Sequence, residues 1–582
     1  MKDYIFPIIT IALLGLFFLG MPELSSIPAC TKLSSREGRR IDRVDALIMA
    51  VVTVIFAFVD FARLGNTDSP ETFAFASGKS VVLTPTEDTV INRILIFTGA
   101  GTGTYEFSFS DDGENYTPAC EINQDYASVL SWKDGIPEET TSPKAVRMTC
   151  SGNAWVGEVF LLDIYDEPIA YTCSVPELCD EQDVYYVTAD YMNSSYFDEI
   201  YHARTAWEHL NNVYPYEITH PPLGKLIISL GIMLFGMTPF GWRFSGTLFG
   251  VLMLPLMYIF AKKLFGSRRS AFAVMLLMAT DFMHYTQTRI ATIDTYSVFF
   301  IILMYLFMYL YISEDRPLWL ALSGVAFGLG AASKWTSLYA GAGLAVIWAA
   351  YRIYKRRDGF RAFIKNCLFC VVFFILIPCV IYYLSYIPYG TASGVTNIFS
   401  ADYLDIVISN QEYMFSYHSN LSATHPYSSV WYQWVLDIRP ILYYLQYYPG
   451  DFRSSFGAFV NPVLCWGGLI AVIVLVYRAV SKRDATAAFI VVGYLAQLVP
   501  WMFVTRLTFE YHYFPCTVFL ALALGYIFKT MEVEGRMPRV CIYSLCGLSL
   551  GLFVLFYPAL SGLRVYGPTA SALLKWLPTW PF

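Results

Sequence analysis

The sequence predicts an α-helical polytopic membrane protein that carries an inserted β-sandwich outside the membrane. Of its 582 residues, 56% are hydrophobic and 15% are charged, whereas soluble domains average about 25% charged residues. Apolar runs of membrane-spanning length recur along the chain and indicate about 11–12 transmembrane helices. The net charge is −7, but residues 66–200 alone hold 24 acidic and 5 basic side chains. This composition excludes an ordinary cytosolic enzyme, and the acidic segment disfavours a nucleic-acid partner.

The apolar runs divide the chain into an N-terminal part and a longer C-terminal part. No small-residue cleavage pattern follows the first run, so we expect residues 1–44 to form an anchor and a basic cytoplasmic loop. Residues 45–65 are expected to be the first transmembrane helix of the core. The runs lie at 4–20, 45–63, 243–261, 270–284, 292–312, 317–333, 336–352, 366–387, 458–477, 485–504, 512–529 and 539–558.

Clusters of Lys and Arg predict the orientation of these helices. The positive-inside rule places the clusters in the cytoplasm, so the protein is expected in the plasma membrane with its long loops outside. Segment 223–239 is short for a crossing, and a crossing there would place a basic cluster outside; we therefore expect an interfacial or re-entrant helix. The clusters are Arg36–Arg43, Lys262–Arg269, Arg352–Lys365, Arg478–Arg483 and Lys529–Arg539.

Residues 66–190 are typical of a β-sandwich, because short alternating runs are separated by turn signals. The stretch 107–116, followed by Trp132 and the run 145–149, loosely resembles discoidin-like carbohydrate-binding modules. The alternative is a sandwich that packs on the outer loops and binds nothing. No metal-ligand spacing stands out in this segment. Its even number of cysteines permits two disulfides in an oxidising compartment. These cysteines are Cys120, Cys150, Cys173 and Cys179.

Residues 191–242 are expected to form an outer loop with interfacial helices, and residues 243–582 the remaining membrane core. On a helix from Tyr196 to about Asn211, Asp198, His202 and His209 share one face at helical spacing, which predicts a carboxylate and two imidazoles at the aqueous boundary. The alternative for the carboxylate is structural, since Ser195-x-x-Asp198 is typical of a helix capping box.

Several motifs follow in order between about residues 190 and 530. They are Tyr196-Phe-Asp-Glu199, His220-Pro-Pro-Leu-Gly-Lys225, Gly241-Trp-Arg243, Asp281-x-x-His284-x-x-Gln287-x-Arg289 with Asp294, Ser333-Lys334-Trp335, the aromatic sequence from Tyr417 to Trp434 within loop 388–457, and Tyr511-His512-Tyr513. In these motifs the chain resembles the protein O-mannosyltransferase family of GT-C glycosyltransferases, in a bacterial-type form without the MIR domain, because loop 388–457 is too short to hold one.

The resemblance implies inverting transfer of mannose from a polyprenyl-phosphate carrier to a Ser or Thr hydroxyl of an exported protein, at the outer face of the membrane. By this analogy Asp198 is the general base, since a hydroxyl is a weak nucleophile until a positioned base takes its proton. Glu199 is expected to orient the acceptor or to share the proton. Because the leaving group is already a phosphodiester, the reaction needs no protein acid, and no metal or other cofactor is expected.

The departing phosphate requires cationic stabilisation. Arg243, Arg289 and Lys334 lie at the outer ends of expected transmembrane helices, where a charged side chain is costly and often has a function. They are therefore the candidate phosphate-binding residues. The alternatives for each are snorkelling or an ion pair, such as one between Arg289 and Asp294.

The remaining motif residues are expected to bind substrate. All seven histidines lie in or beside outward loops, which predicts one polar chamber, although chance and interface preference also explain the distribution. Asp281 and Asp294 are expected to brace the basic residues or contact the sugar, and His418 and His425 to line the acceptor groove. The expected substrate-binding residues are His202, His220, Lys225, Asp281, His284, Gln287, Asp294, His418, His425 and His512.

Two other functions fit parts of the sequence. The same chemistry on a cell-envelope glycan or lipid is one alternative, because the inserted segment makes the acceptor uncertain. A membrane transporter is the other, but it predicts ionisable residues at mid-span and inverted repeats, which the sequence does not show. The expected partners are polyprenyl-phosphate-mannose, the protein or envelope acceptor and the lipid bilayer, whereas the sequence leaves the oligomeric state open.

Overall fold

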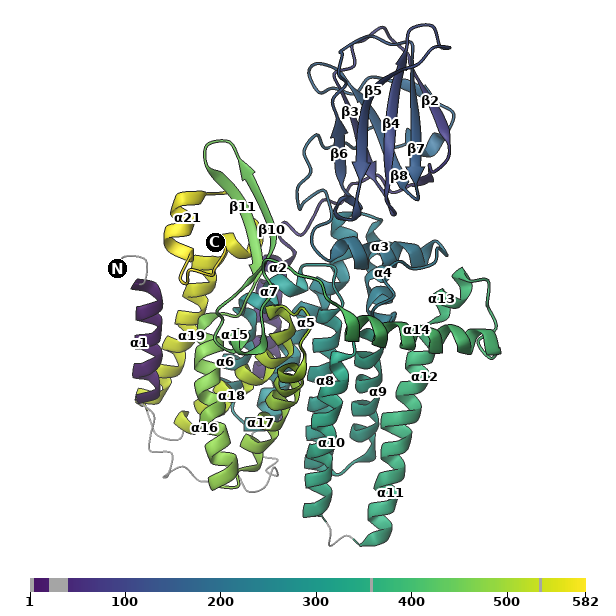
Figure 1. Cartoon of the computed structure of the whole chain (residues 1–582). Helices are drawn as coiled ribbons and strands as arrows, with labels where there is room; N and C mark the ends of the chain where they lie inside the picture. Colours follow the sequence, from purple (N-terminus) through teal and green to yellow (C-terminus); the bar gives the residue numbers. More distant parts are fainter. Residues whose placement is uncertain (1–4, 20–39, 356–358, 533–535) are drawn as a thin grey trace. The chain divides into compact units, whose positions relative to one another are not determined.

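The structure is a computed structural model that describes residues 5–19, 40–355, 359–532 and 536–582 (Figure 1). Cys30 and the start of the basic stretch Arg36–Arg43 lie outside these residues. The chain divides into two compact units. The membrane unit comprises Met1–Ala62, Ile218–Leu226 and Gly246–Phe582, and the insertion unit comprises Arg63–Glu217 and Ile227–Ser245.

The membrane unit is built from apolar helices, as the sequence predicts. Within the described residues, seven helices are long and apolar enough to cross a membrane, and four shorter apolar helices accompany them. The long helices are α2 (Arg43–Phe61), α5 (Pro239–Phe265), α8 (Asp294–Glu314), the run of α11 (Phe360–Val371), η5 (Val372–Leu376), α12 (Ile377–Leu384) and α13 (Ile387–Ala392), η6 (Val463–Gly467) with α16 (Gly468–Ser481), α17 (Ala485–Leu498) with η7 (Val499–Phe503), and η8 (Glu510–Tyr513) with α18 (Phe514–Glu532). The shorter ones are α1 (Ile5–Leu19), α4 (Leu223–Phe235), α9 (Pro317–Ser333) and the apolar part of α19 (Arg536–Phe556).

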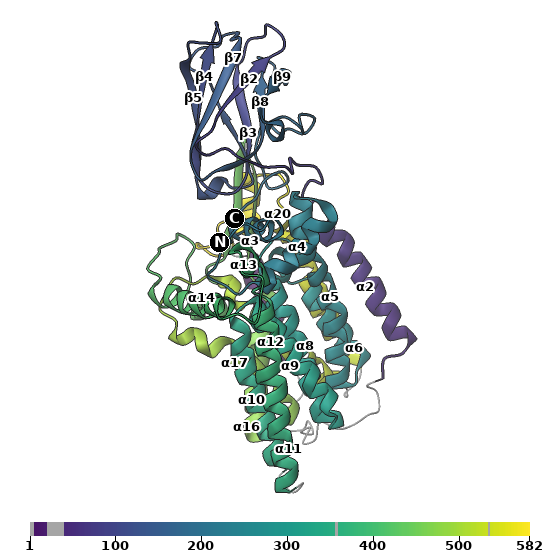
Figure 2. The same cartoon turned by 90° about the vertical axis from the view of Figure 1, so that its right-hand side faces the viewer.

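Burial separates the helices inside the membrane unit from those at its surface. The most apolar window of Glu510–Glu532 is 94% buried, whereas that of Phe360–Ala392 is 6% buried. Helix α18 packs against α6 (Arg268–Ala279), α16 and α17, and α12 packs mainly against α9 (Figures 1 and 2). The exposed apolar surface of Phe360–Ala392 would be unfavourable in water, so this helix is suited to contact with lipid.

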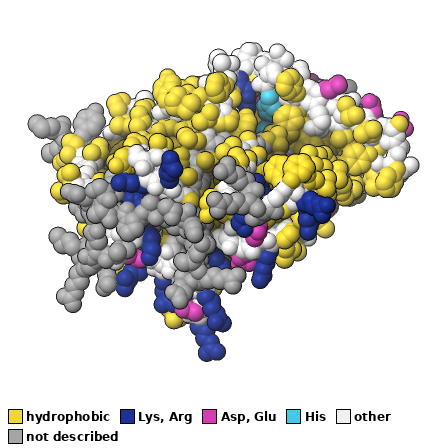
Figure 3. Space-filling view, turned by 90° about the horizontal axis from the view of Figure 1, so that it is seen from below, with side chains coloured by type: hydrophobic (Ala, Val, Ile, Leu, Met, Phe, Trp, Pro, Cys, Tyr) yellow, Lys and Arg dark blue, Asp and Glu magenta, His cyan; other side chains and the backbone are white. Residues whose placement is uncertain are grey.

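Basic side chains gather at one face of the molecule. Figure 3 shows Lys and Arg side chains among hydrophobic ones on the face seen from below, with few acidic groups. Helices α5, α10 (Thr336–Tyr354) and α16 each carry Lys or Arg in their last turn. The positive-inside rule associates such helix ends with the cytoplasm, and the sidedness of the loops stays a prediction.

The insertion unit contains an antiparallel β-sandwich, which confirms the expected insertion. One sheet has the strand order β1-β8-β3-β6 and the other β5-β4-β7-β2-β9. Burial alternates along β2, whereas β3 and β8 are buried almost throughout. The strands are β1 (Ala74–Phe75), β2 (Ser80–Pro85), β3 (Arg93–Thr98), β4 (Gly103–Ser110), β5 (Thr117–Gln124), β6 (Trp132–Gly135), β7 (Ala145–Gly152), β8 (Trp155–Leu162) and β9 (Tyr171–Cys173). The four cysteines of the sandwich are free thiols.

Aromatic contacts hold the sandwich against helix α3 (Glu199–Leu210) of the same unit. The ring of Trp207 lies 5.4 Å from that of Phe73 and 5.5 Å from that of Trp155, both in edge-to-face geometry. Buried aromatic pairs of this kind add about 0.5–1.5 kcal/mol beyond the area that they bury. Helix α4 has 13 residues and rises about 20 Å, which is too short to cross a hydrocarbon core of about 30 Å.

Candidate active site

Asp198 stands immediately before helix α3, in the N-cap position. Its backbone is helical (φ −74°, ψ −3°) and its side chain makes no capping hydrogen bond. The Ser195 hydroxyl donates to the carbonyl of Val129 and also takes no part in a cap. The capping-box alternative is therefore wrong, and the helix begins at Glu199 rather than at Tyr196.

The residue before Asp198 has an unusual backbone conformation. Phe197 has a φ of 48°, in the left-handed region that bulky side chains rarely adopt. Such a conformation costs roughly 1–3 kcal/mol and persists only where the surrounding contacts fix it. Here it turns the chain so that Asp198 enters α3 half-exposed.

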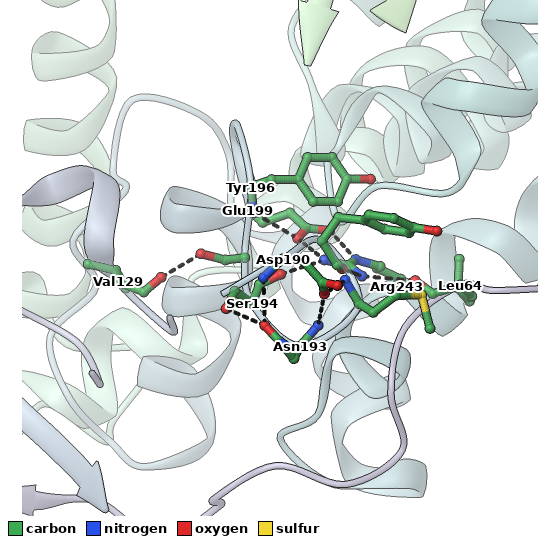
Figure 4. A network of polar contacts seen from close by, with 11 residues as sticks. Leu64, Val129, Asp190, Asn193, Ser194, Tyr196, Glu199 and Arg243 are labelled. Carbon is green, nitrogen blue, oxygen red and sulfur yellow. Dashed lines mark hydrogen bonds and ion pairs between the residues drawn. The ribbon is translucent and has the colours of Figure 1, made fainter. Parts of the chain in front are cut away.

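A buried ion pair between Glu199, the residue after Asp198, and Arg243 fixes this turn. Both carboxylate oxygens of Glu199 accept hydrogen bonds from Arg243, at 2.8 Å from Nε and 2.7 Å from Nη2 (Figure 4). Both side chains have no exposed surface. A bidentate pair of this kind sets the orientation of both groups as well as binding them. We call Glu199 and Arg243 the anchor pair.

Arg243 also binds the chain segments around the pair. Its Nη1 donates to the carbonyls of Leu64 at 2.8 Å and Tyr191 at 2.5 Å, and its Nη2 donates to that of Ser194 at 2.9 Å. The segment before Asp198 is held further by Asn193, whose Oδ1 accepts from the Asp190 backbone N–H at 2.8 Å (Figure 4). Arg243 therefore joins the entry to the insertion with the residues that lead to Asp198.

These contacts change the expected roles of both members of the anchor pair. Arg243 was expected to bind the donor phosphate, but all of its guanidinium nitrogens are engaged by Glu199 and backbone carbonyls. Glu199 was expected to contact the acceptor or share its proton, but its carboxylate is buried against Arg243. Neither side chain is placed to touch a substrate, and both instead position Asp198.

The prediction that His202 and His209 face water is wrong. They are 5% and 8% exposed. The chain reverses at Asn212, which has a φ of 52°. After the reversal, the Tyr216 backbone N–H donates to the Glu208 carboxylate, and the Glu217 backbone N–H donates to the Thr205 hydroxyl on α3. The segment after Asn212 therefore covers the face of α3 that carries His202 and His209, which the helical spacing places at the aqueous boundary.

A second group of candidate residues lies in the membrane unit. Lys334 ends α9 and binds both oxygens of Asp294, at 2.7 and 2.8 Å. Its ammonium group is 5.4 Å from the centre of the Tyr511 ring. The pair is buried, and Asp294 thus braces a basic residue, one of its two expected roles. The basic residue is Lys334 and not Arg289.

Histidines and an arginine lie close to this ion pair. The rings of His220 and His418 are 5.2 Å apart, and His418 Nε2 is 2.8 Å from the carbonyl oxygen of Thr219. Burial, the nearby His220 and Arg506, and Lys334 lower the pKa of His418 to about 4. Lys334 and Arg506 therefore place positive charge beside His418, whose ring stays neutral near pH 7. We call His220, Lys334, His418 and Arg506 the cationic cluster.

The lowered pKa of His418 predicts a pH dependence of stability. The unfolded chain takes up the proton near the ordinary value of 6.5, whereas the folded protein resists it until about pH 4. Stability is therefore full above about pH 6.5 and falls as the pH decreases towards 4. In thermal melts at pH 7.5 and 5, His418→Gln should show a smaller loss of Tm than the wild type. An equal loss in both would contradict this contribution.

Arg506 belongs to this group of residues but lies outside all the sequence motifs. It is half-buried, its Nη1 donates to the Leu507 carbonyl at 3.1 Å, and within the described residues it has no carboxylate partner. The sequence contains a signal for Arg506, because residues 504–512 join the apolar runs 485–504 and 512–529 on the side away from the basic clusters, where a lone arginine has no topological role. Unlike Lys334, this cation is not neutralised by an ion pair.

Arg289 serves the end of a helix rather than a ligand. Its guanidinium donates to the carbonyls of Asp60 and Ala62, the latter at 3.0 Å, and is 6% exposed. Carbonyls at a helix C-terminus lack partners within the helix and attract cations. Arg289 therefore caps α2, and this geometry does not support the expected contact with the phosphate.

Four expected substrate-binding residues are buried in structural contacts. Asp281 accepts from the backbone N–H groups of His284 and Asn461, which caps α7 (Phe282–Thr288). None of the four residues, Asp281, His284, Gln287 and Lys225, has a polar group directed at an open surface, so their roles differ from the expected substrate binding. The other contacts are His284 Nε2 to the Gly250 carbonyl, Gln287 to Thr292 and Tyr443, and Lys225 Nζ to the His220 carbonyl at 2.9 Å.

His512 and His425 lie among aromatic rings. The ring of His512 is 4.4 Å from that of Trp501, its Nδ1 is 2.9 Å from the Phe509 carbonyl oxygen, and the residue is 6% exposed. His425 is half-exposed and lies 5.1 Å from the ring of Phe509. Burial lowers the pKa of His425, so a neutral imidazole is favoured there. His425 is partly exposed to solvent, and its expected contact with the acceptor stays a prediction.

Comparison with known families gives two matches in the membrane core. Residues 219–383 match the model described as dolichyl-phosphate-mannose-protein mannosyltransferase. Residues 403–580 match the model of the C-terminal four-transmembrane region of protein O-mannosyltransferase. Together the two matches extend over more than half of the chain.

Curated relatives and a solved structure agree with these matches. A polyprenol-phosphate-mannose–protein mannosyltransferase of Mycolicibacterium smegmatis is 28% identical over 457 residues, which cover 66% of this chain and 87% of the relative. The protein with the same description from Mycobacterium tuberculosis is 26% identical over 464 residues, covering 66% and 86%. The S. cerevisiae protein O-mannosyltransferase Pmt1-Pmt2 complex bound to the sugar donor matches with a TM-score of 0.58 at 14% identity, covering 67% of this chain and 89% of that chain. The last match shows a shared GT-C fold.

Proposed function

Since the chain belongs to the protein O-mannosyltransferase family of glycosyltransferases, we propose that it transfers mannose from a polyprenyl-phosphate carrier to Ser or Thr hydroxyls of proteins. The observation that carries this proposal is the half-exposed Asp198 at the start of α3, positioned by the buried anchor pair. The relatives act, by their descriptions, on the same donor class and on protein.

Asp198 is the proposed general base. As the acceptor oxygen attacks C1 of mannose, its proton passes to the Asp198 carboxylate, and the bond between C1 and the phosphate oxygen breaks. The electron pair of that bond stays with the departing polyprenyl phosphate. A single displacement of this kind inverts the configuration at C1. The start of a helix favours the negative charge that a base must carry before the reaction.

The cationic cluster is the proposed site for the donor phosphate. Negative charge increases on the phosphate as the bond to mannose breaks, so fixed cations lower the barrier. Arg506 and Lys334 supply the cationic groups, and His220 supplies a ring nitrogen as a hydrogen-bond donor, whereas the neutral His418 ring already donates to the Thr219 carbonyl and packs beside them. No acid has to protonate this leaving group, and we propose that the transfer needs no metal or other cofactor.

Arg506 gives this assignment a specific test. Replacing Arg506 with Gln removes a cation that has no ion-pair partner among the described residues. We expect KM for polyprenyl-phosphate-mannose to rise about tenfold, which corresponds to about 1.4 kcal/mol, with little change in KM for the peptide. Arg439→Gln is the matched control, because Arg439 donates to the Pro426 carbonyl. A donor KM unchanged by Arg506→Gln would remove Arg506 from the phosphate site.

We place the reaction at the outer face of the plasma membrane. The proposal rests on the basic helix ends, which favour the cytoplasm. Exported proteins would then meet the enzyme as they leave the membrane. Labelling of a cysteine introduced at exposed Asp183 by a membrane-impermeant reagent, in intact cells, tests this placement.

The proposed function is tested with purified protein, polyprenyl-phosphate-mannose and a Ser/Thr-containing peptide. Mass spectrometry should find a hexose added to this peptide and none on the same peptide with Ala at every Ser and Thr. Transfer to envelope lipid or glycan but not to peptide would replace the acceptor and keep the chemistry. Release of mannose without an acceptor, or no consumption of the donor, would contradict the proposal.

A further inference from the structure

Three carboxylates converge at one edge of the β-sandwich, away from the residues discussed above. They belong to Glu158 on β8 and to Asp180 and Glu181 in the segment that leaves the sandwich. One oxygen from each lies within 4.8 Å of the others. The sequence does not suggest this group, because Glu158 lies more than twenty residues from the other two.

Glu158 is buried without a full set of partners. Its residue surface is 0% exposed, its Oε1 accepts from Gln182, and its Oε2 has no hydrogen-bond partner. A buried carboxylate oxygen without a partner costs free energy that a protein normally avoids. The exposed Asp180 and half-exposed Glu181 add further negative charge beside the Glu158 carboxylate and do not reduce the cost of burying it. A bound cation would offset this concentration of negative charge.

The surrounding contacts use only part of what the carboxylates offer. The Glu181 oxygens accept from the backbone N–H of Glu71 at 2.9 and 3.0 Å and from that of Thr72 at 3.2 Å. The Thr72 hydroxyl donates to Asp180 at 3.0 Å. These bonds preposition two carboxylates, since each carboxylate accepts about four hydrogen bonds or metal contacts in all.

We propose that Glu158, Asp180 and Glu181 bind one Ca²⁺ ion. All three ligands are oxygens, which selects a hard cation over zinc or copper. Ca²⁺ binds oxygens at about 2.3–2.6 Å, so ligands on opposite sides of it stand about 4.6–5.2 Å apart. Three oxygens that all lie within 4.8 Å of one another can contact one such ion, and the flexible coordination of Ca²⁺ makes it a better match than Mg²⁺, which requires near-ideal octahedral geometry.

The position of the site gives the ion a structural role. Residues 71–72 precede β1 and residues 180–182 follow β9, so the entry and exit segments of the sandwich meet there. The Gln182 side chain also donates to the Val159 carbonyl on β8 at 2.8 Å. Bound Ca²⁺ would hold these segments to β8, and the exit segment continues towards Asn193 and Asp198 of the same unit.

The test measures Ca²⁺ binding to the full chain in detergent micelles by equilibrium dialysis with ⁴⁵Ca²⁺, in millimolar Mg²⁺. The wild type should bind one ion that Asp180→Asn/Glu181→Gln lacks, with a Kd in the range of about 0.1–1 mM that is typical of extracellular modules. Glu87→Gln/Asp88→Asn is the matched control, because it neutralises an adjacent acidic pair that is exposed in the same sandwich. This control should bind like the wild type.

Thermal melts keep the proposal testable if the double variant folds poorly. Ca²⁺ should raise the wild-type Tm, and EDTA should reverse the rise. Glu158→Gln should have a higher Tm than the wild type in EDTA, because burial suppresses the ionisation that the carboxyl group has in the unfolded chain, and should lose the response to Ca²⁺. Equal Ca²⁺ binding by the wild type and Asp180→Asn/Glu181→Gln, or a wild type that binds no Ca²⁺ at 10-fold the expected Kd, would overturn the proposal.

Discussion

Asp198→Asn is expected to reduce kcat for transfer to peptide by about 10²–10⁴-fold, the usual contribution of a positioned general base. The amide keeps the size of the side chain but cannot take the hydroxyl proton. Because Asn has nearly the same size and shape as Asp, the Tm should change much less than kcat. KM for the donor should also stay near the wild-type value, since the phosphate site is assigned to other residues.

Two further variants separate this role from a structural one. Asp198→Glu keeps a carboxylate but moves it by one methylene, so it should retain more activity than Asp198→Asn. Asp183→Asn neutralises an exposed carboxylate of the same unit and should behave like the wild type. If Asp198→Asn retained full kcat, the base would have to be another residue.

Arg243→Met is expected to cause the largest loss of stability in the insertion unit. It leaves the Glu199 carboxylate and the carbonyls of Leu64, Tyr191 and Ser194 buried without their donor. Breaking a buried pair from one side costs about 3–5 kcal/mol. The expected results are a lower Tm, rapid proteolysis between residues 184 and 198, and loss of transfer.

A double-mutant cycle shows whether the loss comes from the anchor pair. Glu199→Gln/Arg243→Met removes both charges, so its cost should be less than the sum of the two single changes. Arg93→Met is the control: its contacts with Asp134 and Asp166 are 3.6 and 3.5 Å long and their partners are exposed, so it should cost at most about 1 kcal/mol. Additive costs in the cycle would show that Glu199 and Arg243 are not coupled.

The sequence predicts the fold well where one physical rule dominates. Apolar runs identify the membrane helices because lipid requires a continuous apolar surface and internal backbone hydrogen bonds. Alternating runs identify the sandwich because one face of each strand is buried. The start of α3 is predicted three residues early, since the periodicity contains no sign that Phe197 adopts a left-handed conformation.

The roles of the charged residues are harder to predict. Position at the outer ends of helices selects Arg243, Arg289 and Lys334 alike, but the structure separates them by what surrounds each guanidinium or ammonium group. Glu199 and Arg243 are 44 residues apart, and their pairing depends on how the chain folds around them. The same limitation hides the carboxylates of Glu158 and Asp180, which only the sandwich brings together.

The central claim is that the acceptor oxygen displaces the phosphate directly at C1 of mannose, with Asp198 taking the proton. The most direct test is the configuration at C1 in the mannosylated peptide, measured by NMR and compared with that of the polyprenyl-phosphate-mannose donor. A single displacement assisted by one base predicts the opposite configuration in the product. The same configuration in donor and product would contradict the account, because it requires two displacements and a mannosyl-enzyme intermediate.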